Sequence, residues 1–480
     1  MRSCLCFALL LLLPRALAAA EAPRATLAFE GPAYVDMPIW VRVTLPDTPN
    51  LRLVQANLRY PLSEIPWGFD GHSFEVRRDG KPLPSLKVQW RSGSTRSPSP
   101  APSGSPAGRL PLHLLYPFDQ PGKYLVKYEY EAQPDGPGPP PAIRAESDWI
   151  ELEVKPFSAQ QREAWLSEKL AHPPRDEGLL VGDYLPSLLA HPDDRVLGAL
   201  TTCFYRPERF VQEMAVYSLD YYPGATVAAV VPKVLHEKGP FRMLSFLPLW
   251  RPDWFRPVAD RLAEAALPYL DSDGAETVGS ALGTLTVLEG HRISFHGPAR
   301  ARADAAIWDH LDHLLTFREP IVLAPLLNFV GVERSARARE AVWKIADRPD
   351  ARPVRQQALL TAAVLGDPRD LPRLGALLAT GDAAVTGLPS QLRITWGDQA
   401  TPYLIAGLHS PNPDTRLPCA CELSLGGHRE GFSYLLAIVE GPDGQAAVGV
   451  MGFMIDHLGL RNGALQPDAV ALLKAKLEPK

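Results

Sequence analysis

The chain is poor in cysteine, with five in 480 residues, and two of these, Cys4 and Cys6, lie close to its N-terminus. The other three, Cys203, Cys419 and Cys421, are an odd number and do not form a disulfide framework. A single bridge from Cys203 to Cys419 or Cys421 stays open, and buried free thiols are the alternative. The Cys-x-Cys pair has no nearby His or further Cys, so it does not indicate a metal site.

The chain also lacks an excess of positive charge, with 49 basic and 54 acidic residues and a net charge of -5. Because binding to phosphates requires a basic face, nucleic acid is not expected as the partner. Beyond the N-terminus no stretch approaches the roughly 20 apolar residues that a membrane-spanning helix needs.

Catalytic signatures are missing as well. We find no G-x-S-x-G, S-x-x-K or H-E-x-x-H motif and no Walker or Rossmann glycine pattern. The sequence therefore predicts no catalytic residue, no cofactor and a protein that is not an enzyme. A triad assembled from distant loops stays open, because such residues meet only in space.

The first residues are typical of a secretory signal peptide, predicted to cover residues 1–18. Arg2 supplies a positive start, Leu5–Leu13 is a short apolar segment, and Ala16-Leu17-Ala18 is a small-x-small cleavage site. We expect an exported protein, periplasmic or extracellular, without a membrane span.

Residues 24–155 are predicted to form β-structure. Apolar residues alternate from Ile39 to Leu45, and Asp79-Gly80 is typical of a hairpin turn. Tyr124, Val126, Tyr128 and Tyr130 share one strand face, and Ile150, Leu152 and Val154 form a closing strand. Two stretches rich in Pro, Gly and Ser, 92–108 and 133–142, are predicted to be disordered loops.

The segment from Tyr116 to Val126, in which a Pro-Gly turn enters a strand carrying Tyr124, resembles the penultimate strand of immunoglobulin-like and fibronectin-type domains. The resemblance implies a β-sandwich with that tyrosine at its corner. No Cys-Trp-Cys pattern occurs, so a disulfide-free variant is implied.

Residues 158–480 are predicted to be helical. Ser158 is placed to cap a first helix with Gln161, as in a capping box. A short motif, Pro followed by any residue and then an aliphatic residue, recurs at irregular intervals within apolar helical segments. This pattern is typical of stacked helical hairpins. Its prolines are Pro186, Pro232, Pro268, Pro325, Pro372 and Pro402.

The segments Tyr184–Val196 and Ala400–Arg416, and more weakly Leu365–Leu378, each give a helix, a turn with Pro and Asp, and a partner helix. Asp in such a turn is expected to cap the partner helix. They resemble HEAT-like repeats, including the type noted in bilin lyases. The resemblance covers roughly 180–435 and implies an α-solenoid that serves as a binding scaffold. It carries over no bilin chemistry, because nothing outside the repeats matches a lyase.

Three polar stretches are interpreted as structural. His310 and His313 share a helix face and could bind a metal, but further ligands are missing. The run 271–276 resembles a calcium loop, yet its Gly stands at position 4, which favours a turn between helices. The basic run Arg334–Arg348 is interleaved with acids, as on a solvated helix face.

Aromatic and arginine residues crowd positions 241–256. Aromatics at helical spacing are typical of a core, whereas aromatics with arginine are typical of binding hot spots. If one ridge binds a partner, this stretch is the first candidate, and its proposed partner-binding residues are Trp250, Arg251, Trp254, Phe255 and Arg256.

The function predicted from sequence is a non-enzymatic scaffold that binds a protein partner of unknown identity, with an unknown oligomeric state. One alternative is an accessory or catalytic protein acting on envelope polymers, which would need a cluster of perturbed acids or a metal. The other is glycan binding through the β-domain, for which Trp67, Trp90 and Trp149 are the residues to check.

Overall fold

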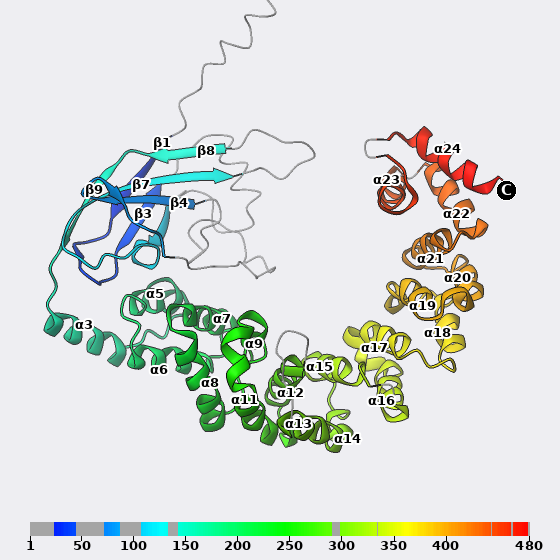
Figure 1. Cartoon of the computed structure of the whole chain (residues 1–480), viewed down its shortest axis with the longest axis horizontal. Coiled ribbons are helices and arrows are strands. Elements are labelled where there is room, and N and C mark those ends of the chain that lie inside the picture. Colours follow the sequence, from blue (N-terminus) through cyan, green and yellow to red (C-terminus); the bar gives the residue numbers. More distant parts are fainter. Residues whose placement is uncertain are drawn as a thin grey trace, which may run out of the picture. The chain divides into compact units, whose positions relative to one another are not determined.

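The computed structural model describes residues 24–44, 72–86, 107–132, 143–289, 298–333, 335–442, 444–461 and 464–478. These residues do not include the predicted signal peptide, most of the two predicted loops, Trp67 or Trp90. A mixed β-sheet comes first and helices make up most of the rest, which confirms the expected order of β and helical regions (Figure 1). The chain divides into two compact units, unit 1 up to Val227 and unit 2 from Ala228.

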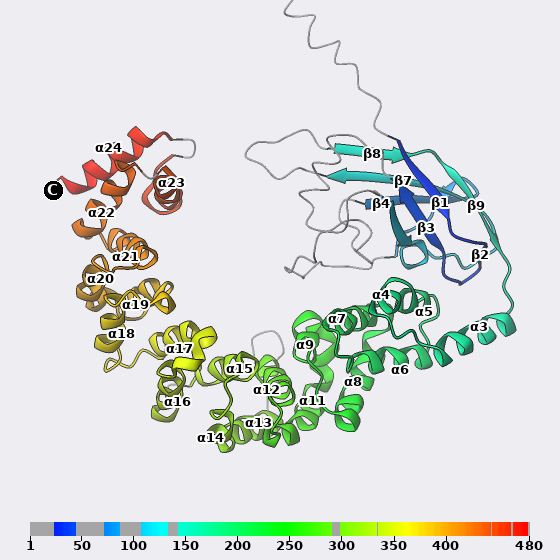
Figure 2. The same ribbon diagram turned by 180° about the vertical axis from the view of Figure 1, so that it is seen from behind.

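The sheet of unit 1 is built around one long strand, β7. The early part of β7 pairs antiparallel with β9 and the late part with β8, while its other edge pairs with β4 (Figure 2). On the far side of β8, β1 pairs antiparallel with β3, which pairs antiparallel with β6. The two pairings β1–β8 and β2–β9 are parallel. The strands are β1 (Arg24–Phe29), β2 (Ala33–Tyr34), β3 (Trp40–Thr44), β4 (His72–Arg78), β5 (Lys81–Pro82), β6 (Ala107–Pro111), β7 (Gly122–Ala132), β8 (Ile143–Ser147) and β9 (Ile150–Lys155).

Alternation along the strands decides which side chains enter the core. In β3, Val41 and Val43 are buried while Arg42 and Thr44 are exposed, as the period of two predicts. Between β4 and β5 the turn residues Asp79 and Gly80 have φ of 51° and 76°, the left-handed values that a tight two-residue hairpin turn requires.

Tyrosines dominate the core of the sheet region. Tyr124 and Tyr128 are fully buried and pack against Phe118 and Phe74, with ring centroids 5.1 and 5.2 Å apart. The hydroxyl of Tyr124 donates a hydrogen bond to the backbone oxygen of Gln120 at 2.7 Å. This bond keeps a buried hydroxyl satisfied and joins the start of β7 to the turn before it.

The first helix after the sheet begins as predicted. The Ser158 hydroxyl accepts from the Gln161 N–H, and the Gln161 side chain accepts from the Ser158 N–H. Asp193 likewise caps the helix that follows it, by accepting from two backbone N–H groups. The helical segments that start in unit 1 are η2 (Leu112–Leu114), α3 (Ala159–Ala171), α4 (Glu177–Leu179), η3 (Leu180–Tyr184), α5 (Leu185–Leu188), α6 (Asp194–Cys203), α7 (Arg209–Tyr217), η4 (Ser218–Tyr221) and α8 (Gly224–Lys238), which runs on into unit 2.

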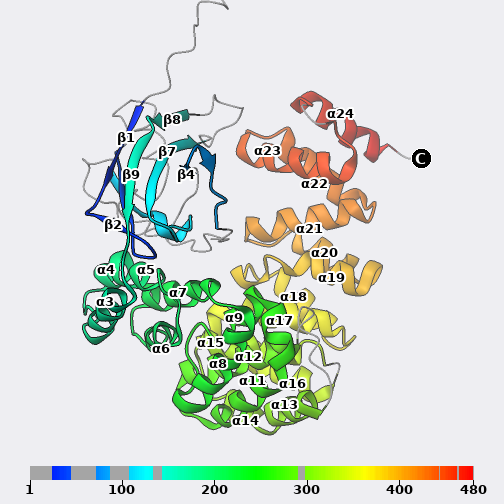
Figure 3. The same cartoon turned by 60° about the vertical axis from the view of Figure 1, so that its left-hand side comes forward.

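In unit 2 the longer helices form two rows (Figures 1 and 3). We call α12, α15, α17, α19 and α21 the first row, because each packs beside the next. We call α13, α16, α18, α20 and α22 the second row, whose members alternate in sequence with those of the first. The helical segments are α9 (Phe246–Trp250), α10 (Pro252–Phe255), η5 (Arg256–Val258), α11 (Ala259–Ala266), η6 (Leu267–Asp271), α12 (Ala275–Glu289), α13 (Pro298–Asp309), α14 (Leu311–Leu314), α15 (Pro320–Val330), α16 (Ala336–Ala346), η7 (Pro349–Ala351), α17 (Arg352–Leu365), α18 (Leu371–Leu378), η8 (Ala383–Val385), α19 (Leu388–Trp396), η9 (Gly397–Ala400), α20 (Thr401–Gly407), α21 (Pro413–Leu425), α22 (Arg429–Val439), α23 (Gly444–Phe453), η10 (Met454–Leu458) and α24 (Gln466–Leu477).

The recurring prolines have two positions in these helices. Pro186, Pro268, Pro372 and Pro402 stand in the first turn of α5, η6, α18 and α20. Of these segments, α5 continues directly from η3 and η6 directly from α11, so Pro186 and Pro268 lie where one helical segment changes into the next. Pro232 and Pro325, by contrast, lie inside α8 and α15. Within the described residues, no helix combines the length and the apolar character that crossing a membrane would demand.

Candidate partner-binding surface

The predicted partner-binding residues lie where α9 gives way to α10. Arg251 stands between the two helices with φ of -129° and ψ of 65°, a non-helical conformation expected of a residue that precedes proline. This break places Trp250, at the end of α9, and Trp254, in α10, around the same guanidinium group. The carbon Cζ of Arg251 lies 4.7 Å from the ring centroid of Trp250 and 5.6 Å from that of Trp254.

Two neighbours extend this group. The ring of Phe246 stacks on Trp250 with centroids 5.8 Å apart, and the side chain of Leu249 is 43% exposed. We call Phe246, Leu249, Trp250, Arg251 and Trp254 the aromatic–arginine cluster. Each contact between a cation and a ring is worth about 0.5–1 kcal/mol at a partly exposed site, so the arginine holds both rings in place.

The other two predicted residues have different surroundings. Phe255 is fully buried, so it packs beneath the surface and is not open to a partner. Arg256 is exposed and lies 3.4 Å from Asp253, its neighbour on the same turn. The structure therefore brings Trp250, Arg251 and Trp254 together and places Phe255 in the core.

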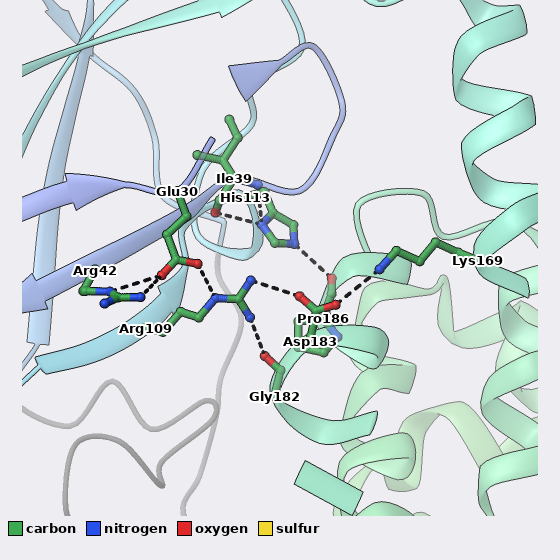
Figure 4. Close-up of polar contacts among 9 residues, drawn as sticks. All are labelled: Glu30, Ile39, Arg42, Arg109, His113, Lys169, Gly182, Asp183 and Pro186. Atoms are coloured by element: carbon green, nitrogen blue, oxygen red, sulfur yellow. Dashed lines mark hydrogen bonds and ion pairs between the residues drawn. The ribbon is translucent and has the colours of Figure 1, made fainter. Parts of the chain in front are cut away.

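A second polar assembly, which the sequence did not indicate, joins the sheet to the helices of unit 1 (Figure 4). Arg109 of β6 is its centre. Its Nε lies 2.6 Å from Glu30, its Nη2 lies 3.0 Å from Asp183, and its Nη1 donates to the oxygen of Gly182 at 3.2 Å. The same guanidinium lies 3.7 Å above the ring of Trp40.

Charges on both sides reinforce this assembly. Lys169 of α3 reaches the second oxygen of Asp183 at 3.2 Å, and Arg42 reaches Glu30 at 2.8 Å. Burial tends to raise the pKa of Glu30, but the guanidinium groups of Arg42 and Arg109 outweigh it and hold this pKa below its usual value. Glu30 is thus kept ionised as one end of a chain of charges between sheet and helix.

His113 makes a second polar link between the sheet and the helices of unit 1 (Figure 4). We call this link and the assembly around Arg109 the sheet–helix seam. Its Nδ1 lies 3.0 Å from the Ile39 nitrogen and 3.1 Å from the Ile39 oxygen, and its Nε2 lies 2.9 Å from the oxygen of Pro186. When the proton of the neutral ring is on Nε2, the ring donates to Pro186 and accepts from the Ile39 N–H. Burial lowers the pKa of His113, and the positive charge of Arg109 acts in the same direction.

The histidine pair considered as a metal site does not converge. His310 bonds through Nδ1 to the oxygen of Ala306 at 2.8 Å, whereas His313 bonds through Nε2 to the oxygen of Ser272 at 3.1 Å. Across the part of the chain that the structure describes, no three His, Cys, Asp or Glu side chains come together in a way that could hold a metal ion.

The calcium-like run and the basic run also have structural surroundings. In the turn between η6 and α12, the Ser272 hydroxyl accepts from the Gly274 N–H at 3.2 Å. Of the basic run, Arg337 donates to the oxygen of Trp308, Arg339 pairs with Asp370, and Arg348 donates to the oxygen of Leu315. Arg334 lies outside the described residues.

One pair of acids has an unusual environment. Arg300 of α13 lies 3.0 Å from Glu289, at the end of α12, and 3.7 Å from Asp304 of α13. Burial and the nearby negative charge of Asp304 raise the pKa of Glu289 well above its usual value.

The three cysteines of the described chain are free, and Cys203 and Cys419 are buried. Burial raises the pKa of Cys203 to about 11 and the pKa values of Cys419 and Cys421 to about 12. Such thiols stay protonated at neutral pH and are poor nucleophiles.

No protein-family model matches the chain, and no curated protein matches its sequence, so these comparisons assign no role to this surface.

Proposed function

We propose that this chain is an exported, non-enzymatic scaffold that binds a protein partner through its helical region. The helical region is, in this proposal, an α-solenoid of HEAT-like hairpins. The alternation of first-row and second-row helices in unit 2 supports it, because each hairpin then buries its apolar stripe against the next one. A stack of this kind leaves long helix faces open to a partner.

We further propose that the sheet region is an immunoglobulin-like sandwich. In this proposal β1–β3–β6 and β9–β7–β4–β5 are the two faces of the sandwich, and β8, which pairs with both β7 and β1, joins them at one edge. The hydrogen bond from the Tyr124 hydroxyl to Gln120 corresponds to the tyrosine at the corner of such domains. The seam around Arg109 and His113 would hold this domain at the start of the helices.

The observation that carries the binding function is the aromatic–arginine cluster. Tryptophan and arginine are the residue types that contribute most at protein interfaces, because they combine a large apolar area with directed polar groups. Here the guanidinium of Arg251 orients both tryptophans before any partner arrives. A preorganised anchor loses less side-chain entropy on binding, so its contribution to affinity is larger.

The test is affinity capture from an envelope extract with the chain lacking residues 1–18, followed by mass spectrometry. The Trp250→Ala/Trp254→Ala variant should lose the protein that the parent chain retains. Lys233→Ala is the control, because Lys233 is exposed on α8, lies outside the predicted partner-binding residues and is 3.9 Å from Glu237. Retention of the same protein by both variants, or of none by the parent chain, would contradict the proposal.

The two alternatives have weaker support. For glycan binding, the guanidinium of Arg77 lies 4.5 Å from the ring of Trp149 and covers one of its faces. For action on envelope polymers, Glu289 beside Asp304 is the perturbed acid that such chemistry needs, but Glu289 is paired with Arg300 at 3.0 Å.

A further inference from the structure

A second histidine–arginine pair joins the sheet region to the helices of unit 1, outside the residues drawn in Figure 4. His191 follows α5, and with Arg162 of α3 it lines a cavity of about 360 Å³. The Nη1 of Arg162 lies 3.2 Å from the carboxylate of Asp36, between β2 and β3. The Asp36 N–H donates to the oxygen of Phe118 at 3.0 Å, which ties this aspartate to the sheet region.

The two pairs lie at either end of α5. At its start, His113 contacts the oxygen of Pro186, while Arg109 pairs with the acid of the preceding helical segment. Just after its end comes His191, while Arg162 pairs with the acid of the sheet region. Each histidine is therefore accompanied by an arginine whose own ion pair runs from sheet to helix.

His113 is unfavourably placed to carry a charge. Burial lowers its pKa, and the guanidinium of Arg109 acts in the same direction. The acid that favours a charged ring is Asp183, but its two oxygens already accept from Arg109 at 3.0 Å and from Lys169 at 3.2 Å. The closed seam therefore holds this ring in its neutral form.

His191 is under the same constraint. Burial lowers its pKa, and the charge of Arg162 adds to the effect, whereas Asp36 and Asp193 oppose it. Both acids are already paired, Asp36 with Arg162 and Asp193 with Arg195. A charged imidazole carries a proton on each ring nitrogen, yet among the described residues the buried Nε2 of His191 has no hydrogen-bond partner. A proton added there would lack an acceptor.

Separation of the sheet from these helices would bring both rings into water. Each would then titrate near its ordinary pKa of about 6.5, so below that pH the open form binds more protons than the closed form. The closed form is fully favoured above pH 6.5 and loses ground as the pH falls through that value. Each histidine that stays neutral when closed shifts the ratio of closed to open form by up to about tenfold per pH unit.

We propose that the sheet–helix seam and the His191–Arg162 pair together form a pH-sensitive latch. Below about pH 6.5, His113 and His191 take up protons and the sheet separates from α4, η3 and α5, while unit 2 stays folded. The inference goes beyond the proposed scaffold function and does not depend on a partner.

The helical segments under the seam report its opening. α4, η3 and α5 contain three, five and four residues. Isolated helices shorter than about 12 residues are marginal in water, so the backbone hydrogen bonds of these segments depend on packing against the rest of unit 1. Loss of the sheet should therefore appear as faster exchange of their amide hydrogens.

The test is hydrogen exchange followed by mass spectrometry on the chain lacking residues 1–18, at pH 7 and pH 5, corrected for the intrinsic pH dependence of exchange. Protection of residues 177–188 should fall at least about tenfold at pH 5, while that of α17 in unit 2 stays constant. His113→Gln/His191→Gln should remove most of this fall, because glutamine does not titrate, and each single variant should reduce it. His236→Gln/His409→Gln, at two exposed positions, is the matched control and should keep it.

Equal protection at the two pH values in the parent chain, or an unchanged fall in the double variant, would overturn the inference. A fall that includes α17 would do the same, because it would mean that the whole chain unfolds in acid. Circular dichroism at pH 7 checks that each variant is folded. If the double variant is not, the two single variants decide, and an unchanged fall in both would contradict the latch.

Discussion

Two contacts between neighbouring helices of unit 2 show how differently its two rows can be held together. In the second row, charge joins α16 to α18: Arg339 of α16 pairs with Asp370, and Arg373 of α18 lies 3.6 Å above the ring of Trp343. In the first row, α12 meets α15 through a glycine, since a Cβ on Gly279 would lie 2.6 Å from the Ile321 oxygen. The α16–α18 contact thus depends on charge, whereas the α12–α15 contact depends on close backbone packing.

The largest effect on stability is expected when the buried acid of the second row is removed. Asp370 is fully buried and accepts from Arg339 and from the indole N–H of Trp343, at 2.9 Å in both cases. Asp370→Ala leaves the Trp343 N–H without its acceptor and leaves Arg339 with the more distant Asp367, 3.6 Å away. We expect a loss of roughly 3 kcal/mol in the free energy of unfolding. Urea unfolding followed by far-ultraviolet circular dichroism measures it.

Asp398→Ala supplies the comparison for Asp370. Asp398 is an exposed acid beside the first row, and its loss should change the free energy of unfolding by less than about 0.5 kcal/mol. If the two variants unfolded at the same urea concentration, the second row would not depend on its buried acid.

The next effect tests close packing between α18 and α20. Gly375 of α18 faces the ring of Tyr403 of α20, so a Cβ there would collide with the ring. We expect Gly375→Ala to cost about 1–3 kcal/mol through overpacking. Gly449, inside α23, has no atom near its missing Cβ, so Gly449→Ala should add about 0.5–1 kcal/mol. A thermal melt of the pair gives shifts of opposite sign; a shift of the same sign would contradict this packing.

The sheet–helix seam of unit 1 resembles the second row, because an arginine again lies over a tryptophan and pairs with acids. It adds a histidine that is neutral when folded. Since burial lowers the pKa of His113, the unfolded chain takes up a proton near pH 6.5 that the folded chain does not. The stability that this neutral histidine supports is complete above pH 6.5 and declines as the pH falls below it, by at most about 1.4 kcal/mol per pH unit.

Hydrogen exchange of the Ile39 amide reports this directly, because its N–H donates to His113. After correction for the intrinsic pH dependence of exchange, protection of this amide should decrease between pH 7 and pH 5. His113→Gln should remove most of that decrease, whereas His409→Gln, at an exposed position, should keep it. A pH-independent protection in the parent chain would show that the seam does not depend on the neutral histidine.

Local signals in the sequence identified local structure well. The Ser158–Gln161 capping box, the Asp79-Gly80 turn and the Asp193 cap each depend on residues within a few positions. In the segment Ala400–Arg416 the capping residue differs from the expected Asp414. Asn412 caps α21, and Pro413 and Asp414 lie in its first turn. The order of β and helical regions followed from the change of periodicity near residue 156.

Long-range contacts could not be predicted in the same way. Trp40 alternates with the core residues of β3, yet it is only 6% exposed, because Arg109 of β6, a paired strand that is distant in sequence, covers it. Arg339 looked like part of a solvated basic run, but its acid lies 31 residues away. Phe255 and Trp254 are adjacent in sequence, and only packing distinguishes the buried ring from the half-exposed one.

The smallest expected effect is at two exposed aliphatic side chains near the ends of the first-row helices α15 and α19. Val332 and Ile394 are about 70% exposed, so little apolar area is lost from the core when either becomes lysine. We expect Val332→Lys and Ile394→Lys each to change the free energy of unfolding by less than about 0.5 kcal/mol in urea. A loss above about 1 kcal/mol would mean that these side chains support the fold, whereas a neutral result would mean that the first row is held by the close contacts between its helices and not by the residues at their ends.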